Sequence, residues 1–389
     1  MGERIYLDWN ATAPLRPEAR AAMVAALDAV GNPSSVHKEG RAARHLIEAA
    51  RENVAALIGA EPRNVIFTSG GTEANALAVT PHLACGSDEA PRGRLLLSAI
   101  EHASVRAGGR FAADRVEEIP VNADGVVDLG ALERRLAELA GSRPLVSIMH
   151  ANNETGVLQP IAAAAAMVHA SGGLLHVDAV QSVGKIPFDI NPLGADLVTL
   201  SAHKLGGPKG VGALVLRSAD LHVADPLIKG GGQERGLRAG TENVAGIVGF
   251  GTAASAARAQ SEEACRIKAL RERLEAGLER AAIVFGAGAE RLPNTTLFAV
   301  PGVKAETALI ALDLAGFAVS SGSACSSGKV SASHVLAAMG VPAALAAGAI
   351  RVSIGYATTE GDIDLFLRAW TKLSVGLSKR AKDNRGLAA

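Results

Sequence analysis

The chain has 389 residues, of which 48% are hydrophobic and 20% charged, as expected for a globular protein large enough for more than one hydrophobic core. Its 39 Lys and Arg residues balance 39 Asp and Glu residues, so net charge does not favour nucleic acid or an anionic membrane as a partner. The opening MGERIYLDWNATAP is too polar for a signal peptide, and no uninterrupted apolar run approaches the length of a membrane span. We therefore expect a cytoplasmic protein.

Short β-rich runs alternate with Ala-rich amphipathic stretches between residues 40 and 220. The runs are VIFTSG, RLLLSA, LVSIMH, LLHVDA, DLVTLSAH and GALVLR. Such alternation is typical of βαβ units around a mostly parallel sheet. The sequence therefore predicts an α/β fold with a large domain over residues 15–258.

The remaining residues predict a smaller α/β domain. A helical pattern follows the Gly-rich stretch 230–240 and runs to residue 282, and the runs TTLFAV, FAVSSGS and RVSIGY then alternate with helices. We assign residues 1–14 and 259–389 to this domain. The polar segment SKRAKDNRGLAA at its end is predicted to be frayed.

Asp178 and Lys204 each follow a predicted strand, in HVDAVQ and SAHKLGG. The carboxyl ends of strands are where open α/β sheets present ligand groups. A carboxylate that keeps a pyridine nitrogen protonated and a lysine that forms a Schiff base are the two groups that a pyridoxal phosphate enzyme needs. The alternative is that Asp178 closes a turn and Lys204 is a solvated loop lysine.

The segment FTSGGTEANAL predicts a phosphate site. It leads from a strand through Ser69, Gly70, Gly71 and Thr72 into a helix, where backbone N–H groups and the helix dipole favour an anion. Ser201 and His203, beside Lys204, could add a hydroxyl and an imidazole donor. Simple helix capping is the alternative.

Other polar residues fit the same chemistry less specifically. His102 in EHASV could stack on the cofactor ring and exchange protons, although a lone histidine is more often structural. Asn153 and Gln181 are neutral donors suited to a phenolic oxygen or a substrate carboxylate, or they close turns. Arg351 offers a bidentate fork for an α-carboxylate, against the alternative of an ordinary ion pair.

Three cysteines, Cys85, Cys265 and Cys325, are widely separated and lack metal-ligand spacing, so neither a disulfide framework nor a metal site is predicted. Cys85 ends an apolar stretch expected to be helical, and Cys265 lies in a charged helix. Cys325 differs, because SSGSACSSGK surrounds it with small residues that suit an accessible, reactive thiol. An incidental loop cysteine is the alternative.

These motifs, in their order and approximate spacing, closely resemble the cysteine desulfurases, a branch of the class V aminotransferase group of fold-type I pyridoxal phosphate enzymes. The resemblance covers nearly the whole chain and includes YLDWNATAP, VGNPSSVH, GGGQERGLRAGTEN, LPNT and IRVSIG as well as the segments above. The short SSGSAC loop and the segments QERGLRAGTEN and RLPNT look like the NifS/IscS-like branch.

The resemblance implies roles for individual residues. Lys204 would carry pyridoxal 5'-phosphate, Asp178 would face the pyridinium, and His102 would stack on the ring. Gln181 would contact the phenolic oxygen, with Asn153 close by, and Arg351 would bind the substrate carboxylate. The phosphate would be held by Gly71, Thr72, Ser201 and His203, and by Thr241 reaching across a homodimer.

The implied reaction converts L-cysteine to L-alanine and leaves the sulfur on Cys325 as a persulfide, which then passes to an acceptor such as an iron–sulfur scaffold protein. Mobility of the loop at about 320–329 belongs to this hypothesis, because one thiol must meet both substrate and acceptor. Nitrogen fixation, general cluster assembly and tRNA thiolation remain open as destinations. The alternatives are a selenocysteine lyase, another pyridoxal phosphate lyase or aminotransferase of this fold, and an idle fold that serves as an interaction partner.

Overall fold

The computed structural model describes residues 4–88, 90–259, 263–278, 282–321 and 333–386, with side chains up to residue 374. Cys325 and most of the predicted loop 320–329 lie outside the described residues. No helix in these ranges combines the length and the hydrophobicity that a membrane span requires.

The seven-stranded sheet is mostly parallel, as predicted, with the strand order β2-β9-β8-β7-β6-β4-β5. Only β9 runs antiparallel to its neighbours β8 and β2 within this sheet. Its strands are β2 (Val65–Thr68), β4 (Leu95–Ser98), β5 (Val116–Ile119), β6 (Leu145–Ser147), β7 (Leu174–Asp178), β8 (Leu197–Ser201) and β9 (Gly212–Leu216). The short strands β3 (Leu83–Cys85) and β10 (Leu221–Val223) form a separate antiparallel pair.

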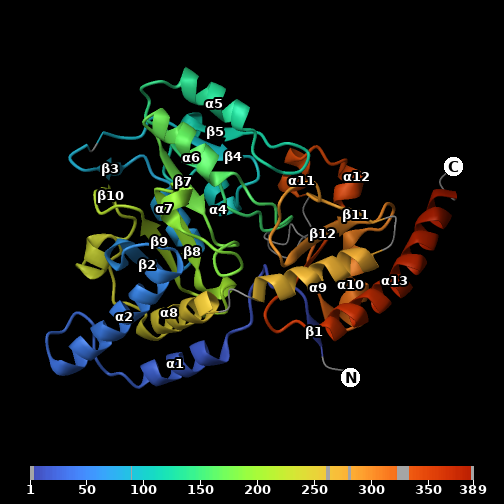
Figure 1. Cartoon of the computed structure of the whole chain (residues 1–389), viewed down its shortest axis with the longest axis horizontal. Helices are drawn as coiled ribbons and strands as arrows, with labels where there is room; N and C mark the ends of the chain where they lie inside the picture. Colours follow the sequence, from blue (N-terminus) through green and yellow to red (C-terminus); the bar gives the residue numbers. More distant parts are fainter. Residues whose placement is uncertain (1–3, 89, 260–262, 279–281, 322–332, 387–389) are drawn as a thin grey trace.

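Alternate residues of the buried strands point into two hydrophobic cores, one on each face of the large sheet. Val177 and Val198 belong to the face covered by α2, α5, α6 and α8, whereas Leu174 and Leu197 belong to the face that includes α3 and α4. The helices of this part are α1 (Pro17–Leu27), α2 (Lys38–Leu57), α3 (Gly71–Ala78), α4 (Ala103–Arg106), α5 (Leu129–Glu138), α6 (Ile161–Ala170), α7 (Ile190–Leu193) and α8 (Val244–Ala259). Figure 1 shows helices on both sides of the sheet.

A second sheet, of three antiparallel strands in the order β11-β12-β14, lies beside the first part of the molecule (Figure 1). Its strands are β11 (Ile283–Val284), β12 (Thr295–Ala299) and β14 (Ile350–Ser353), and β1 (Ile5–Tyr6) pairs with β13 (Phe317–Ala318) nearby. The helices are α9 (Glu263–Gly277), α10 (Ala305–Leu314), α11 (His334–Ala338), α12 (Ala343–Ala346) and α13 (Glu360–Gly386). The two-domain division at residue 258 stays a prediction.

One local prediction was wrong. Cys85 ends strand β3 and not a helix, because residues 83–85 pair with β10. Helix α13 includes the segment SKRAKDNRGLAA as far as Gly386, and its predicted fraying stays a prediction.

Candidate active site

The carboxyl ends of β7 and β8 bring the predicted residues Asp178 and Lys204 to the same edge of the sheet. The two strands are parallel neighbours, with Asp178 opposite Thr199. Asp178 is the last residue of β7, and Lys204 ends the 3₁₀ turn Ala202–Lys204 that follows β8 directly. Ser201, 4% exposed, is the last residue of β8.

The Asp178 carboxylate is buried and fixed by two donors. Its Oδ1 accepts the backbone N–H of Val180 at 3.0 Å, so the residue closes a turn as well as facing the site. Its Oδ2 accepts the amide of Asn75 at 2.8 Å. Asn75 lies in the quoted segment FTSGGTEAN but was not singled out from the sequence.

His102 is connected to Asp178 through Asn75. The Asn75 amide also donates to Ser104 Oγ at 2.9 Å, and Ser104 Oγ lies 2.8 Å from His102 Nδ1. The same Nδ1 accepts the Ser104 backbone N–H at 3.2 Å and caps α4. Nδ1 therefore carries no proton in this geometry, and the neutral ring has its hydrogen on Nε2.

A cavity of about 340 Å³ lies at the N-terminus of α3, where the phosphate site was predicted. The residues that line it include Gly71, Thr72, Ser201 and His203, together with Lys209, for which the sequence predicted no role. Glu73 also lines the cavity, but its carboxylate forms an ion pair with Arg238 at 3.0 Å. Ser69 is less available than expected, because its backbone N–H donates to Glu73 at 2.9 Å and its hydroxyl donates to the same carboxylate. The cavity fits an anion, since it joins hydroxyls, an imidazole, an ammonium and a helix N-terminus.

His203 stays neutral at physiological pH. Burial, reinforced by the charges of Lys204, Lys209 and Lys185, lowers its pKa to about 4. Its Nδ1 lies 2.9 Å from the hydroxyl of Thr12. A neutral imidazole in this place can donate one hydrogen bond to an anion in the cavity.

Asn10, from the segment YLDWNATAP, joins several predicted residues. The Lys204 amine donates to the backbone oxygens of Asn10 at 2.5 Å and Ala11 at 2.9 Å. The Gln181 amide donates to the same Asn10 oxygen at 3.0 Å. Lys204 is therefore held by the N-terminal segment.

Arg351, on β14, is 3% exposed and lies beside Asn153. Its guanidinium donates to the backbone oxygen of Asn153 at 2.9 Å and to Asp8 Oδ1 at 2.8 Å. Its buried Nε has no hydrogen-bond partner in the described part of the chain, and neither has the hydroxyl of Ser320, opposite Arg351 across a β-bridge. Unpaired donors of this kind suit an anionic substrate group.

Thr241 lies apart from these contacts. It is exposed, precedes α8, and lines neither the anion cavity nor the cavity between the two parts of the molecule. Its predicted role across a homodimer stays a prediction. The role of Cys325 also remains a prediction, because that residue is outside the described ranges.

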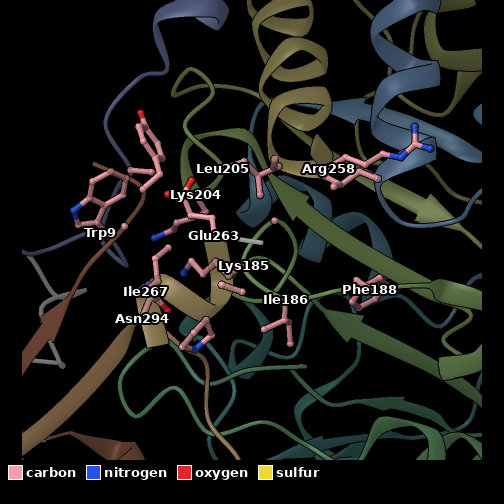
Figure 2. Close-up of a pocket in the computed structure, with 18 of the residues that line it drawn as sticks. Trp9, Lys185, Ile186, Phe188, Lys204, Leu205, Arg258, Glu263, Ile267 and Asn294 are labelled. Atoms are coloured by element: carbon pink, nitrogen blue, oxygen red, sulfur yellow. The ribbon is translucent and has the colours of Figure 1, made fainter. Parts of the chain in front are cut away.

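A second cavity, of about 300 Å³, lies on another side of Lys204, between the two parts of the molecule (Figure 2). Trp9, Lys185, Phe188, Ile267 and Asn294 line it together with Lys204. Lys185 and Lys204 follow strands of the large sheet, whereas Asn294 precedes β12 of the smaller sheet, so both parts of the molecule contribute to the cavity (Figure 2).

The class-V aminotransferase family matches residues 5–366, and the chain belongs to this family. It is 46% identical over 374 residues to a cysteine desulfurase from Cereibacter sphaeroides, with 94% of each chain covered. It is 42% identical over 376 residues to the cysteine desulfurase IscS of Dictyoglomus turgidum, covering 94% of this chain and 93% of the relative.

The fold is also similar to solved structures. A NifS-like protein from Rickettsia africae superposes with a TM-score of 0.87 at 38% identity, covering 96% of this chain and 99% of that one. The predicted resemblance to the NifS/IscS-like cysteine desulfurases is thereby confirmed, as is the α/β fold.

Proposed function

We propose that this chain is a cysteine desulfurase that binds pyridoxal 5'-phosphate and transfers the sulfur of L-cysteine to Cys325. The observation that carries the proposal is the arrangement at the sheet edge. A buried carboxylate, Asp178, and a lysine held by backbone oxygens, Lys204, follow adjacent parallel strands, and the anion cavity adjoins them. Membership of the family supports it independently.

The residues around the site fit the proposed cofactor. Lys204 would bind its aldehyde and Asp178 its pyridine nitrogen, while Gln181 would donate to the phenolic oxygen. Gly71, Thr72, Ser201 and His203 would hold the phosphate, with Lys209 adding a positive charge. His102 would lie against the ring, and Thr241 of the partner subunit would complete the phosphate site in a homodimer.

When bound, pyridoxal phosphate supplies an electron sink for bonds at the Cα of an amino acid. The chain's own residues then divide the work. Arg351 would orient the substrate carboxylate, with Asn153 beside it, because its Nε is available and its fork is fixed by Asp8. Lys204, once released, and the neutral His102 would carry protons to and from the substrate.

The sulfur transfer needs no external oxidant. The Cys325 thiolate attacks the substrate sulfur, so that the substrate carbon–sulfur bond breaks and a sulfur–sulfur bond forms on the protein. Protonation of the remaining carbon skeleton yields L-alanine. The persulfide sulfur then passes to an acceptor, for which iron–sulfur cluster assembly is one destination. A thiol nucleophile requires a reducing compartment, so a cytoplasmic location belongs to the proposal.

Cys325→Ser tests the proposal. The variant is expected to retain the yellow colour of the bound cofactor and to lose production of alanine from L-cysteine in the presence of a reductant. Cys265→Ser is the matched control, because Cys265 is exposed on α9, and it should retain full activity. Full activity of Cys325→Ser would instead favour a lyase or aminotransferase in which this thiol is a bystander.

A further inference from the structure

Lys185 lies in the turn after β7, four residues beyond Gln181, and has no role in the proposed function. Its amine donates to Gln181 Oε1 at 2.8 Å and to Asn10 Oδ1 at 3.0 Å. Within the described residues, no carboxylate forms an ion pair with it. A lysine in such surroundings donates hydrogen bonds to neutral oxygens, and its charge is not compensated locally.

We propose that Lys185 is a positioning residue that, with Asn10, fixes the Gln181 amide so that its NH₂ group faces the cofactor. The inference rests on the proposed function, since it concerns how Gln181 meets the phenolic oxygen. It is carried by the hydrogen bonds among Lys185, Gln181 and Asn10.

The hydrogen bonds determine which end of the Gln181 amide carries the oxygen and which carries the nitrogen. Lys185 occupies Oε1 as a donor, and one hydrogen of Nε2 goes to the Asn10 backbone oxygen at 3.0 Å. A flipped amide would set its oxygen against the Asn10 oxygen and its NH₂ group against the Lys185 amine. The observed orientation leaves the second Nε2 hydrogen for a ligand.

Asn10 makes this arrangement rigid, because its side chain is 1% exposed and both of its ends are hydrogen-bonded. Its Oδ1 also accepts from Asn294 at 3.0 Å, and its Nδ2 donates to Thr295 Oγ1 at 2.9 Å and to the Asn153 backbone oxygen at 3.1 Å. The Asn10 backbone oxygen, shared by Gln181 and Lys204, is therefore a fixed point of the site.

The surroundings of Lys185 disfavour a positive charge on its amine. Burial, then the positive charges of Lys204 and Arg351, hold its pKa well below the ordinary value. The charge of Lys185 also lowers the pKa of His203. Arg16, Arg258 and Glu263 are the other charged groups that line the cavity beside Lys185. The amine donates to its two acceptors, Gln181 Oε1 and Asn10 Oδ1, in this environment.

The test compares Lys185→Met with a control, Lys268→Met, on the exposed surface of α9. A hydrogen bond to the phenolic oxygen draws charge from the neighbouring chromophore. Loss of this hydrogen bond should raise the pH at which the absorbance band of the protonated cofactor disappears. We expect that rise in Lys185→Met, together with a fall in kcat of about tenfold and little change in KM.

A double-mutant cycle with Gln181→Met shows whether Lys185 acts through Gln181. In the Gln181→Met background, Lys185→Met should shift the absorbance titration no further. Lys185→Gln, one bond shorter, is the second variant if Lys185→Met does not fold, and it should shift the titration in the same direction by less. Thermal unfolding of each cofactor-free variant separates these effects from loss of the fold.

The inference is overturned if Lys185→Met titrates and turns over like Lys268→Met, or if its shift persists undiminished in the Gln181→Met background. Failure of the proposed function would look different. The unmutated protein would then bind no cofactor, or would form no alanine from L-cysteine.

Discussion

At the scale of single residues, hydrogen bonds through neutral side chains hold the groups that are proposed to be catalytic. Asn75 is the clearest case, because one amide nitrogen contacts both Asp178 at 2.8 Å and Ser104 at 2.9 Å. Ser104 in turn orients His102. Asn75 therefore supports both Asp178, which is proposed to face the pyridine nitrogen, and His102, which is proposed to lie on the ring.

Asn75→Ala should lower kcat by about tenfold, because it removes a buried hydrogen bond to Asp178 and releases Ser104. The cofactor should still bind, since the residues proposed to hold its phosphate are unchanged. Steady-state kinetics and cofactor absorbance measure the two effects. Asn122→Ala, in an exposed turn, serves as the control. Equal kcat values for the two variants would show that the Asn75 link has no part in catalysis.

The sequence identifies the residues that follow strands and misses those that support them. Asp178 and Lys204 could be predicted because each has the residue type and the strand-end position that the chemistry requires. Asn10 could not be predicted, because its partners Gln181 and Lys204 are 171 and 194 residues away along the chain. Lys185 likewise acquires its surroundings only when the N-terminal segment packs against the turn after β7.

At the scale of elements, the close fit between α3 and the end of β8 shapes the anion cavity. A Cβ atom added at Gly71 would lie 3.1 Å from Val180 Cγ2 and 3.3 Å from the Cβ of Ser201. Both separations are tighter than ordinary carbon–carbon contacts. Glycine at this position therefore lets the first turn of α3 approach Ser201.

Gly71→Ala should weaken binding of pyridoxal phosphate by about tenfold, because Ser201 must move away from the cavity. The melting temperature of the cofactor-free protein should change little, since alanine favours the helix. Fluorescence titration with the cofactor measures the affinity. Gly361→Ala in α13 is the control, because an added Cβ would make only an ordinary contact there, 3.7 Å from Thr359 Oγ1. An unchanged dissociation constant would refute this reading of Gly71.

Element prediction succeeded where strands are apolar and failed where they are polar or short. All six predicted strands of the large sheet form, because each is a buried run. Strand β5, with the sequence VEEI, was missed because it is an edge strand with partly exposed carboxylates. The strands β3 and β10 have three residues each and pair only with one another in the described structure.

At the scale of the whole molecule, the N-terminal segment connects the two parts. Leu7 packs in the core beside the smaller sheet, and Asn10, three residues later, accepts the Lys204 amine at the edge of the larger one. Composition and strand spacing predict the α/β class and the parallel sheet. They do not predict this return of the N-terminus, because it depends on contacts between distant segments.

Stability of the cofactor-free protein should fall as the pH decreases from about 6.5 toward 4. Burial lowers the pKa of His150, His176 and His203 to about 4 from an ordinary value of 6.5. The unfolded chain therefore binds protons in this interval before the native protein does, and stability present above pH 6.5 is lost as the pH falls through the native pKa.

Urea unfolding at several pH values measures this effect. For His176, the fully buried case, the loss is about 3 kcal/mol at 1.36 kcal/mol per pKa unit. Glu101 acts in the opposite sense, because burial raises its pKa. The difference in the free energy of unfolding between the native chain and His176→Gln gives the contribution of this histidine. Parallel pH profiles for the two proteins would contradict the assignment.

The most direct test of the central claim is peptide mass spectrometry after incubation with L-cysteine and rapid alkylation. The proposal predicts one additional sulfur atom on the peptide that contains Cys325, with one alanine formed for each sulfur transferred in the first turnover. Cys85 and Cys265 should carry none. Formation of alanine while the Cys325 peptide gains no sulfur would contradict the claim that this thiol accepts the substrate sulfur.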